Sequence, residues 1–378
     1  MTMMDTTRLR LDRIASSTKN ARLGRSVIIG SQIVAAEGYV LAVRILEDKT
    51  TYNSVEDLTG RMVPLRAGDV LAGTLGYRRA LHGYAGEVPE HVAVGDTIHV
   101  LNLGGVLGRC TSASPELGPP FRAEVLGAVL SFPALGDRIG RPAHIQEGAI
   151  PPADTLRVPF PIVYVAGTCM NTGKTVAASE LVRGLSKSGL SVGACKLTGV
   201  SLMRDSLHML DAGAIHALTF SDCGLPSTRG SVAVRTAKGL LNRLADAKPD
   251  VVVAELGDGI LGEYGVQEIL SDAELRTAAG AFVGAAPDPV GSWGAVELLR
   301  KQYGIAVTAL TGPATDNEVG LDYIKSALGL PAHNARRDAK GLLSVVLRAL
   351  KNRLPAQSTN AITSATADFD HPSLELGR

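Results

Sequence analysis

One segment, PIVYVAGTCMNTGKTVAASELV (residues 161–182), constrains the fold more than any other part of the chain. An apolar run ends at Gly167, a short polar loop follows, and Gly173-Lys174-Thr175 opens an amphipathic stretch. The run predicts a buried strand, and the stretch that follows the loop predicts a helix. The backbone N–H groups of such a loop, together with the positive end of the helix dipole, bind phosphate oxygens. The segment therefore predicts a phosphate-binding strand–loop–helix unit.

Two side chains of this segment have predicted roles at a bound nucleotide. Lys174 would neutralise charge on the β- and γ-phosphates, and the hydroxyl of Thr175 would bind Mg²⁺. The usual spacing, G-x4-G-K-[ST], would place a glycine at position 168, but Thr168 stands there and the glycine comes one residue earlier. We expect magnesium and ATP as cofactors, with GTP not excluded. The loop residues expected to contact the nucleotide are Gly167, Thr168, Asn171, Thr172, Gly173, Lys174, Thr175 and Val176.

The rest of the C-terminal half alternates apolar runs with amphipathic stretches from residue 159 to residue 354. Strands buried on both faces indicate a parallel sheet covered by helices, so this region is predicted to be an α/β P-loop NTPase domain. The tail over 355–378 is rich in Ser, Thr and Ala and is predicted to be disordered.

The N-terminal half has a different pattern. Short apolar runs broken by glycine fill residues 26–132, which predicts a small all-β domain, either a barrel or a sandwich. Residues 1–25 are polar and basic and are expected to form a flexible arm. Residues 133–158 carry several prolines and are interpreted as a linker or an extended strap across the domain junction.

The phosphate loop GTCMNTGKT resembles the G-T-D-x-x-V-G-K-T loop of dethiobiotin synthetases, a class related to MinD-like ATPases and metal-insertion GTPases. CKLTG (195–199) is similar to their K-P-x-x-[ST]-G, and VVVAELGDG (251–259) to their strand ending in E-G-x-G-G. The resemblance covers roughly residues 159–350. It implies that Lys196 faces the substrate as a catalytic residue beside Lys174, and that Asp205 and Glu255 join Thr175 as magnesium ligands. It also implies a homodimer or larger homo-oligomer.

The acidic positions are also plausible without the resemblance. Glu255 and Asp258 stand where a predicted strand ends, which is where α/β proteins bind ligands, and Mg²⁺ needs few protein ligands. Two alternatives stay open: Asp205 is also a good helix cap, and Glu255 is also consistent with a buried salt bridge.

Other polar positions have weaker predicted roles. RDSLHMLDAGA (204–214) is similar to a stretch of MobB-type GTP-binding proteins, and places His208 near a substrate or on the surface. Asn317, or Asp316 beside it, is the candidate reader of the nucleotide base. Arg229 is either a phosphoryl-stabilising residue or a solvated loop residue. The cluster Arg78, Arg79, His82 and Tyr84 could close over the site, but a solvated turn is favoured.

Composition excludes some classes of partner. The formal net charge is +1, so nucleic acid is not expected as the main ligand. No apolar run approaches the roughly 20 residues of a membrane helix, and the chain is expected to be cytoplasmic.

Three functions fit these observations. The leading hypothesis is a Mg-dependent ligase that uses a nucleoside triphosphate to activate a small carboxylate, or a carbamate, by phosphorylation. The first alternative is a nucleotide-gated assembly factor or metallochaperone-type GTPase or ATPase. The second is a kinase of a small metabolite.

Overall fold

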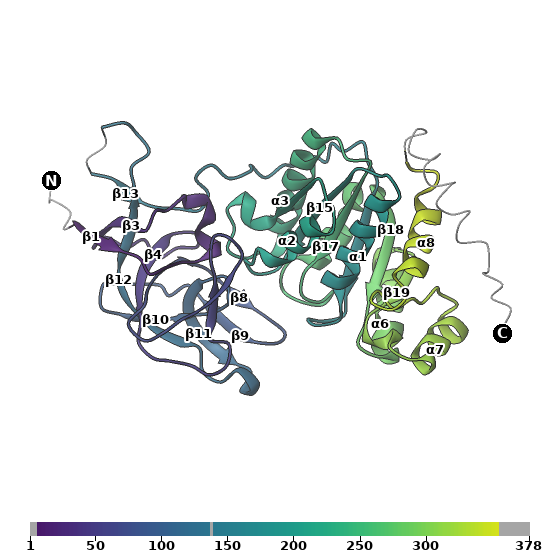
Figure 1. Cartoon of the computed structure of the whole chain (residues 1–378), viewed down its shortest axis with the longest axis horizontal. Coiled ribbons are helices and arrows are strands. Elements are labelled where there is room, and N and C mark those ends of the chain that lie inside the picture. Colours follow the sequence, from purple (N-terminus) through teal and green to yellow (C-terminus); the bar gives the residue numbers. More distant parts are fainter. Residues whose placement is uncertain (1–5, 137–138, 355–378) are drawn as a thin grey trace, which may run out of the picture.

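The computed structural model describes residues 6–136 and 139–354, which form two parts that lie side by side (Figure 1). The N-terminal part, purple to blue in the figure, is built almost entirely of strands. The bounds of these strands are β1 (Thr6–Arg10), β2 (Arg13–Ile14), β3 (Ser26–Gly30), β4 (Val40–Ile45), β5 (Ser54–Glu56), β6 (Met62–Pro64), β7 (Val70–Leu75), β8 (Arg78–Arg79), β9 (Tyr84–Glu87), β10 (Thr97–Val100), β11 (Val106–Ala113), β12 (Phe121–Ser131) and β13 (Arg141–Pro142).

Five of these strands form a closed barrel. β12 pairs with β4, β4 with β7, β7 with β11, β11 with β10, and β10 pairs again with β12. Buried side chains from all five strands share one hydrophobic cluster, which includes Leu41, Leu71, Leu107, Ile98 and Val125. Because the ring is closed, it has no free strand edge. Of the two predicted all-β architectures, the structure is therefore the barrel and not the sandwich.

The predicted flexible arm is wrong for residues 6–25, the part of it that the structure describes. β1 pairs with β3 in antiparallel register from Thr6↔Gly30 to Arg10↔Ser26. Leu11 is fully buried, and Ser16–Ala21 forms the 3-10 helix η1, whose first residues are also buried. β1 itself is mostly exposed, so its backbone ladder holds it in place rather than an apolar face. This is why its polar composition concealed a strand.

The boundaries of the predicted linker also change. β13 pairs with β12, and both Ala143 and Ile145 are buried in a second cluster of the barrel domain. The chain then crosses to the second domain as an extended strap. The N–H of Ile150 donates to the backbone oxygen of Asp222 at 2.8 Å, and that of Arg157 donates to Asn242 Oδ1 at 2.7 Å. The predicted disordered tail, 355–378, lies outside the described residues.

The C-terminal part confirms the predicted α/β class. Its six-stranded sheet has the order β16-β15-β17-β14-β18-β19, and every pair in it is parallel. The strands are β14 (Ile162–Gly167), β15 (Val192–Thr198), β16 (His216–Thr219), β17 (Val251–Leu256), β18 (Ala279–Ala285) and β19 (Ala309–Thr311). The helices are α1 (Lys174–Lys187), α2 (Arg204–Asp211), α3 (Gly230–Leu244), α4 (Val266–Ser271), α5 (Ala273–Thr277), α6 (Pro289–Tyr303), α7 (Glu318–Leu328) and α8 (Ala339–Leu350). Across the described ranges, no helix combines the length and the apolar character needed to cross a membrane.

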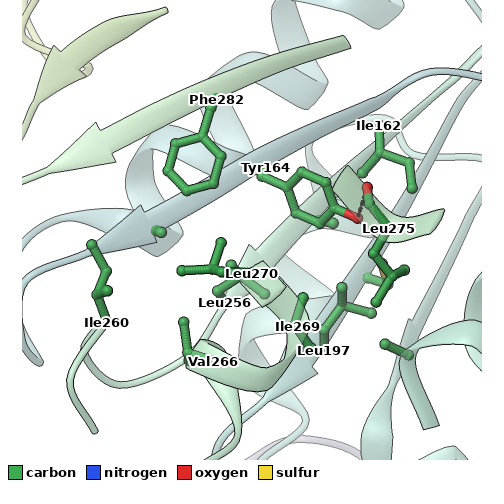
Figure 2. Packing of buried hydrophobic residues seen from close by; sticks show 14 of the residues in the cluster. Ile162, Tyr164, Leu197, Leu256, Ile260, Val266, Ile269, Leu270, Leu275 and Phe282 are labelled. Atoms are coloured by element: carbon green, nitrogen blue, oxygen red, sulfur yellow. Dashed lines mark hydrogen bonds between the residues drawn. The ribbon is translucent and has the colours of Figure 1, made fainter. Parts of the chain in front are cut away.

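Helices cover both faces of this sheet, and β14 shows why. Val163 and Val165 point into the cluster formed with α1 and α8, whereas Ile162 and Tyr164 point into the cluster formed with α3 to α7. This alternation is the period of two expected for a strand. Figure 2 shows the cluster formed with α3 to α7, in which the Tyr164 hydroxyl donates to the backbone oxygen of Leu275 at 3.1 Å. The side chains of β14 are therefore buried on both faces of the sheet, and the one polar group among them is hydrogen-bonded.

The two domains meet along the segment between β15 and α2. Glu56 of β5 is fully buried, and its carboxylate accepts the backbone N–H groups of Met203 at 2.6 Å and Arg204 at 2.8 Å. Asn102 Nδ2 donates to the backbone oxygen of Ser201 at 2.7 Å. The barrel therefore supplies the cap of α2, which is the helix that carries Asp205.

Gly104 tests how closely these domains approach. A Cβ at this position would lie 2.0 Å from the backbone oxygen of Ser201, so we expect Gly104→Ala to lower the free energy of unfolding by about 2 kcal/mol. Gly294→Ala in α6 is the control, because nothing lies within 4 Å of its added Cβ, and alanine there should be neutral or stabilising by up to about 1 kcal/mol. Chemical denaturation measures both. Equal stabilities for the two variants would contradict the tight junction.

Candidate functional site: a phosphate loop facing the barrel

The phosphate loop has the predicted local structure. β14 ends at Gly167, Gly173 adopts a left-handed φ of +85°, and α1 begins at Lys174. Gly167 is required for a spatial reason: a Cβ there would lie 2.4 Å from Thr172 Oγ1 and 3.0 Å from the side chain of Lys174. Gly312, just after β19, packs on the loop equally closely, because its Cβ would lie 2.5 Å from the Thr172 backbone oxygen. The C-terminal part therefore combines a parallel sheet with a strand–loop–helix unit of the phosphate-binding type.

Lys174 is buried at the centre of the loop. Its Nζ donates to the backbone oxygen of Cys169 at 2.6 Å, and no carboxylate of the described chain lies within ion-pair distance of it. Burial lowers the pKa of Lys174, and the nearby Glu255 opposes this shift only in part. A buried cation without an anionic partner is costly, so the loop is arranged to receive a negatively charged ligand.

The residues at the end of β17 fit a magnesium ion. The hydroxyl of Thr175 donates to Glu255 Oε1 at 3.0 Å, while Glu255 Oε2 is buried without a partner. Neither carboxylate oxygen of Asp258 has a partner in hydrogen-bond geometry, although the backbone N–H of Leu81 faces this carboxyl group. Burial raises the pKa of both acids. Oxygen ligands of this kind suit Mg²⁺, so Thr175 and Glu255 would hold the ion, with Asp258 beside them.

The carboxylate of Asp205 is paired with a lysine in this structure. Its Oδ2 forms a buried ion pair with Nζ of Lys196. Burial opposes both charges, but the pairing outweighs it, lowering the pKa of Asp205 and raising that of Lys196. The open alternative, that Asp205 caps its helix, is not what the structure shows, because Glu56 supplies that cap. Asp205 as a magnesium ligand stays a prediction. Within the described ranges, no cluster of three or more His, Cys, Asp and Glu side chains could hold a metal.

A cavity of about 960 Å³ joins the phosphate loop to the barrel. From the P-loop domain it is lined by Asn171 to Val176, Lys196, Asp205, His208, Glu255 and Asp258, and from the barrel domain by Tyr52, Arg78, His82, Asn102 and Ser114. The structure thus brings together most of the predicted site residues. Gly167 and Thr168 lie beneath the loop and are not part of the cavity lining.

The predicted base reader is not at this cavity. Asn317 is exposed, and its Oδ1 accepts the N–H of Gly320 at 3.2 Å as the N-terminal cap of α7. Asp316 is also exposed and accepts from Asn334 Nδ2 at 2.8 Å. An asparagine just before a helix is commonly a cap, and a role in reading the base stays a prediction. Beyond the loop, the cavity runs past Ser179 and Arg183 of α1 to Arg336.

The two arginines with open interpretations have different outcomes. Arg229 is half-exposed, as the solvated-loop interpretation expects, and lies outside the cavity lining; its Nη2 pairs with Glu37 Oε2 at 2.8 Å, and its guanidinium stacks on Tyr77. Arg78 was assigned to a solvated turn, but it is only 3% exposed and lines the cavity. Sequence reasoning missed Asn102 and Glu56 altogether, because their partners are about 100 to 150 residues away in the chain.

Comparison with known proteins gives only distant likenesses. No family model matches the chain, and no curated protein matches it. Solved structures with similarity include a DUF1611 family protein from Anabaena variabilis (TM-score 0.36, 17% identity, 53% of this chain and 63% of that one). Others are chloroplast FtsY from Physcomitrella patens (0.35, 13%, 53% and 70%) and a ParA family ATPase from Chlorobium tepidum (0.30, 13%, 56% and 99%).

Proposed function

We propose that this protein binds a magnesium–nucleoside triphosphate and uses its γ-phosphate to activate a small carboxylate or carbamate, as a ligase does. The observation that carries this proposal is the cavity itself, which continues from the phosphate loop to polar side chains of the barrel. Its size, about 960 Å³, is at the upper end for a small-molecule site, which leaves space for a second substrate beside the nucleotide.

Each side chain near the loop has a specific task in this reaction. Lys174 would stabilise charge on the transferring phosphoryl group, and Lys196 would do the same once its pairing with Asp205 loosens. Thr175 and Glu255 would hold Mg²⁺, which neutralises phosphate charge. A carboxylate oxygen would bond to the γ-phosphorus while the bond to the β–γ bridging oxygen breaks. The nucleoside diphosphate leaves, and a nucleophile such as an amine or ammonia then attacks the acyl phosphate and displaces phosphate.

Phosphate release in the presence of a panel of carboxylic acids tests this function, with ATP and GTP in parallel. We expect one acid, together with an amine or ammonium, to raise the rate of phosphate release at least tenfold above the rate with nucleotide alone. A stable phosphorylated product that forms without release of phosphate would instead support the kinase alternative. Slow release that no acid changes would overturn the ligase proposal.

One observation favours the assembly-factor alternative. Glu56 ties the barrel to the N-terminus of α2, and α2 carries Asp205 in its first turn, so a nucleotide-dependent shift of α2 would reach the barrel directly. On this alternative the barrel presents a surface to a partner protein instead of a substrate site. Nucleotide hydrolysis stimulated only by a protein, and by no small acid, would identify this function.

A further inference from the structure

We infer that Arg78 is the carboxylate-binding residue of a second-substrate subsite that the barrel contributes to the cavity. The inference rests on the proposed function, because it identifies the chemical class of the acceptor and the residue that holds it. The charge of the Arg78 side chain, and the groups that surround it, point to this role.

Arg78 is a buried cation without an ion-paired carboxylate. The carboxyl group of Asp258 is near enough for the charge of Arg78 to oppose the rise that burial causes in its pKa, but the two groups form no ion pair. Its side chain comes from β8 and is 3% exposed. Nη1 donates to the Tyr52 hydroxyl at 2.9 Å and to the backbone oxygen of Leu101. Nε is buried and has no acceptor. In the part of the chain that the structure describes, no carboxylate lies within ion-pair distance of the guanidinium. An arginine in this position is expected to meet a negative charge from elsewhere.

Aromatic side chains fix the orientation of this guanidinium. Its carbon lies 5.5 Å from the centroid of the Tyr52 ring and 5.6 Å from that of Tyr84, and the two rings pack edge to face. The close approach of Gly83 limits movement further, because a Cβ there would lie 2.6 Å from Nη2. The planar guanidinium is therefore held rigidly. Nη1 is already engaged by Tyr52 and Leu101, and Nε is buried, so Nη2 is the nitrogen that is left to donate to a carboxylate oxygen.

The position of Arg78 separates this subsite from the nucleotide phosphates. The phosphate loop already offers Lys174, the backbone of residues 171–173 and the N-terminus of α1 to phosphate. Arg78 instead belongs to the barrel, and shares its part of the cavity with Tyr52, Asn102 and Ser114. The chemistry of this part suits an anion with polar neighbours, which a carboxylic acid supplies and a nucleobase does not.

Arg79 is a matched control next in the sequence. Its side chain is half-exposed, it is outside the cavity lining, and its Nε lies 3.8 Å from Glu263. Replacing Arg79 therefore removes the same charge from the same strand without touching the cavity. A general electrostatic effect of arginine would appear in both variants, whereas a subsite effect would appear only at position 78.

The test uses the full chain saturated with magnesium and a non-hydrolysable ATP or GTP analogue. Acetate, succinate, glutarate, citrate and benzoate are the probes, each paired with its uncharged amide, and binding is followed by calorimetry. We expect at least one acid to bind the wild type while its amide does not. Arg78→Gln should weaken that acid at least tenfold, Arg79→Gln should leave its affinity unchanged, and both variants should keep wild-type affinity for the nucleotide analogue.

Arg78→Lys keeps the charge but removes the planar guanidinium, and it serves if Arg78→Gln does not fold. It should also weaken the acid while leaving nucleotide affinity unchanged. Unchanged acid affinity in the Arg78 variants would overturn the inference, as would the absence of binding by every acid. An equal loss of nucleotide affinity would place Arg78 in the nucleotide site and also overturn it. Failure of the wild type to bind the nucleotide analogue at all would instead refute the proposed function.

Discussion

Replacing Lys174 with alanine is expected to abolish the thermal stabilisation that a magnesium–nucleotide complex gives the wild-type protein. At a ligand concentration of 100 Kd, bound ligand adds about 2.7 kcal/mol to the free energy of unfolding, and the variant should gain close to none. The reason is geometric: Lys174 is the buried cation at the centre of the loop, and its Nζ contacts only loop oxygens.

The stability of Lys174→Ala without nucleotide separates a loss of binding from a loss of folding. Because burial lowers the pKa of Lys174, its charge is held at a cost, and alanine should not lower the stability of the free protein. Lys187→Ala, at the exposed end of the same helix, is the control and should keep the full stabilisation by nucleotide. Thermal unfolding with and without Mg·ATP or Mg·GTP measures both variants. If the shift persists in Lys174→Ala, the assignment of the phosphate loop is wrong.

The second large effect is expected at Glu56. Glu56→Ala removes the acceptor of two backbone N–H groups at the part-buried start of α2, at a cost of about 1–3 kcal/mol for each donor left unsatisfied. We expect a loss of about 4 kcal/mol in the free energy of unfolding. Asp288→Ala removes an exposed cap of α6 and should cost only about 1 kcal/mol.

Denaturant unfolding and nucleotide affinity are measured together for this pair. Since α2 carries Asp205, which pairs with Lys196 at the cavity, Glu56→Ala should also weaken ligand binding, whereas Asp288→Ala should not. A cost at Glu56 no larger than at Asp288 would show that the barrel does not stabilise α2.

Sequence patterns predicted what depends on neighbours along the chain. The phosphate loop follows from one continuous segment, and the parallel sheet follows from apolar runs that alternate with helices. The arm was misjudged because β1 is held by a partner strand about 20 residues further on, and its own side chains stay exposed. Asn317 caps α7, a role that the sequence interpretation did not consider, and its role as base reader stays a prediction.

Contacts between residues far apart in the sequence could not be predicted. Within the barrel domain, Arg78 is indicated as a turn residue by its neighbours in sequence, but Tyr52, Leu101 and Tyr84 enclose it. Across the domain junction, the pairing of Arg229 with Glu37 has no signal in the sequence. Lys196 and Asp205 both line the cavity beside the phosphate loop, but their mutual pairing depends on the path of the chain between them. The homodimer that the resemblance implies stays a prediction.

The cap that Glu56 places on α2 also bears on the order in which the chain acquires its structure. The barrel is complete once residue 145 has been synthesised, before any strand of the parallel sheet exists. Domains generally fold as units in the order of their synthesis. If the barrel domain forms first, Glu56 and Asn102 are already in position to hydrogen-bond the segment at the start of α2 when that segment is synthesised. A P-loop domain expressed from residue 159 onward would lack these hydrogen-bond partners for the start of α2.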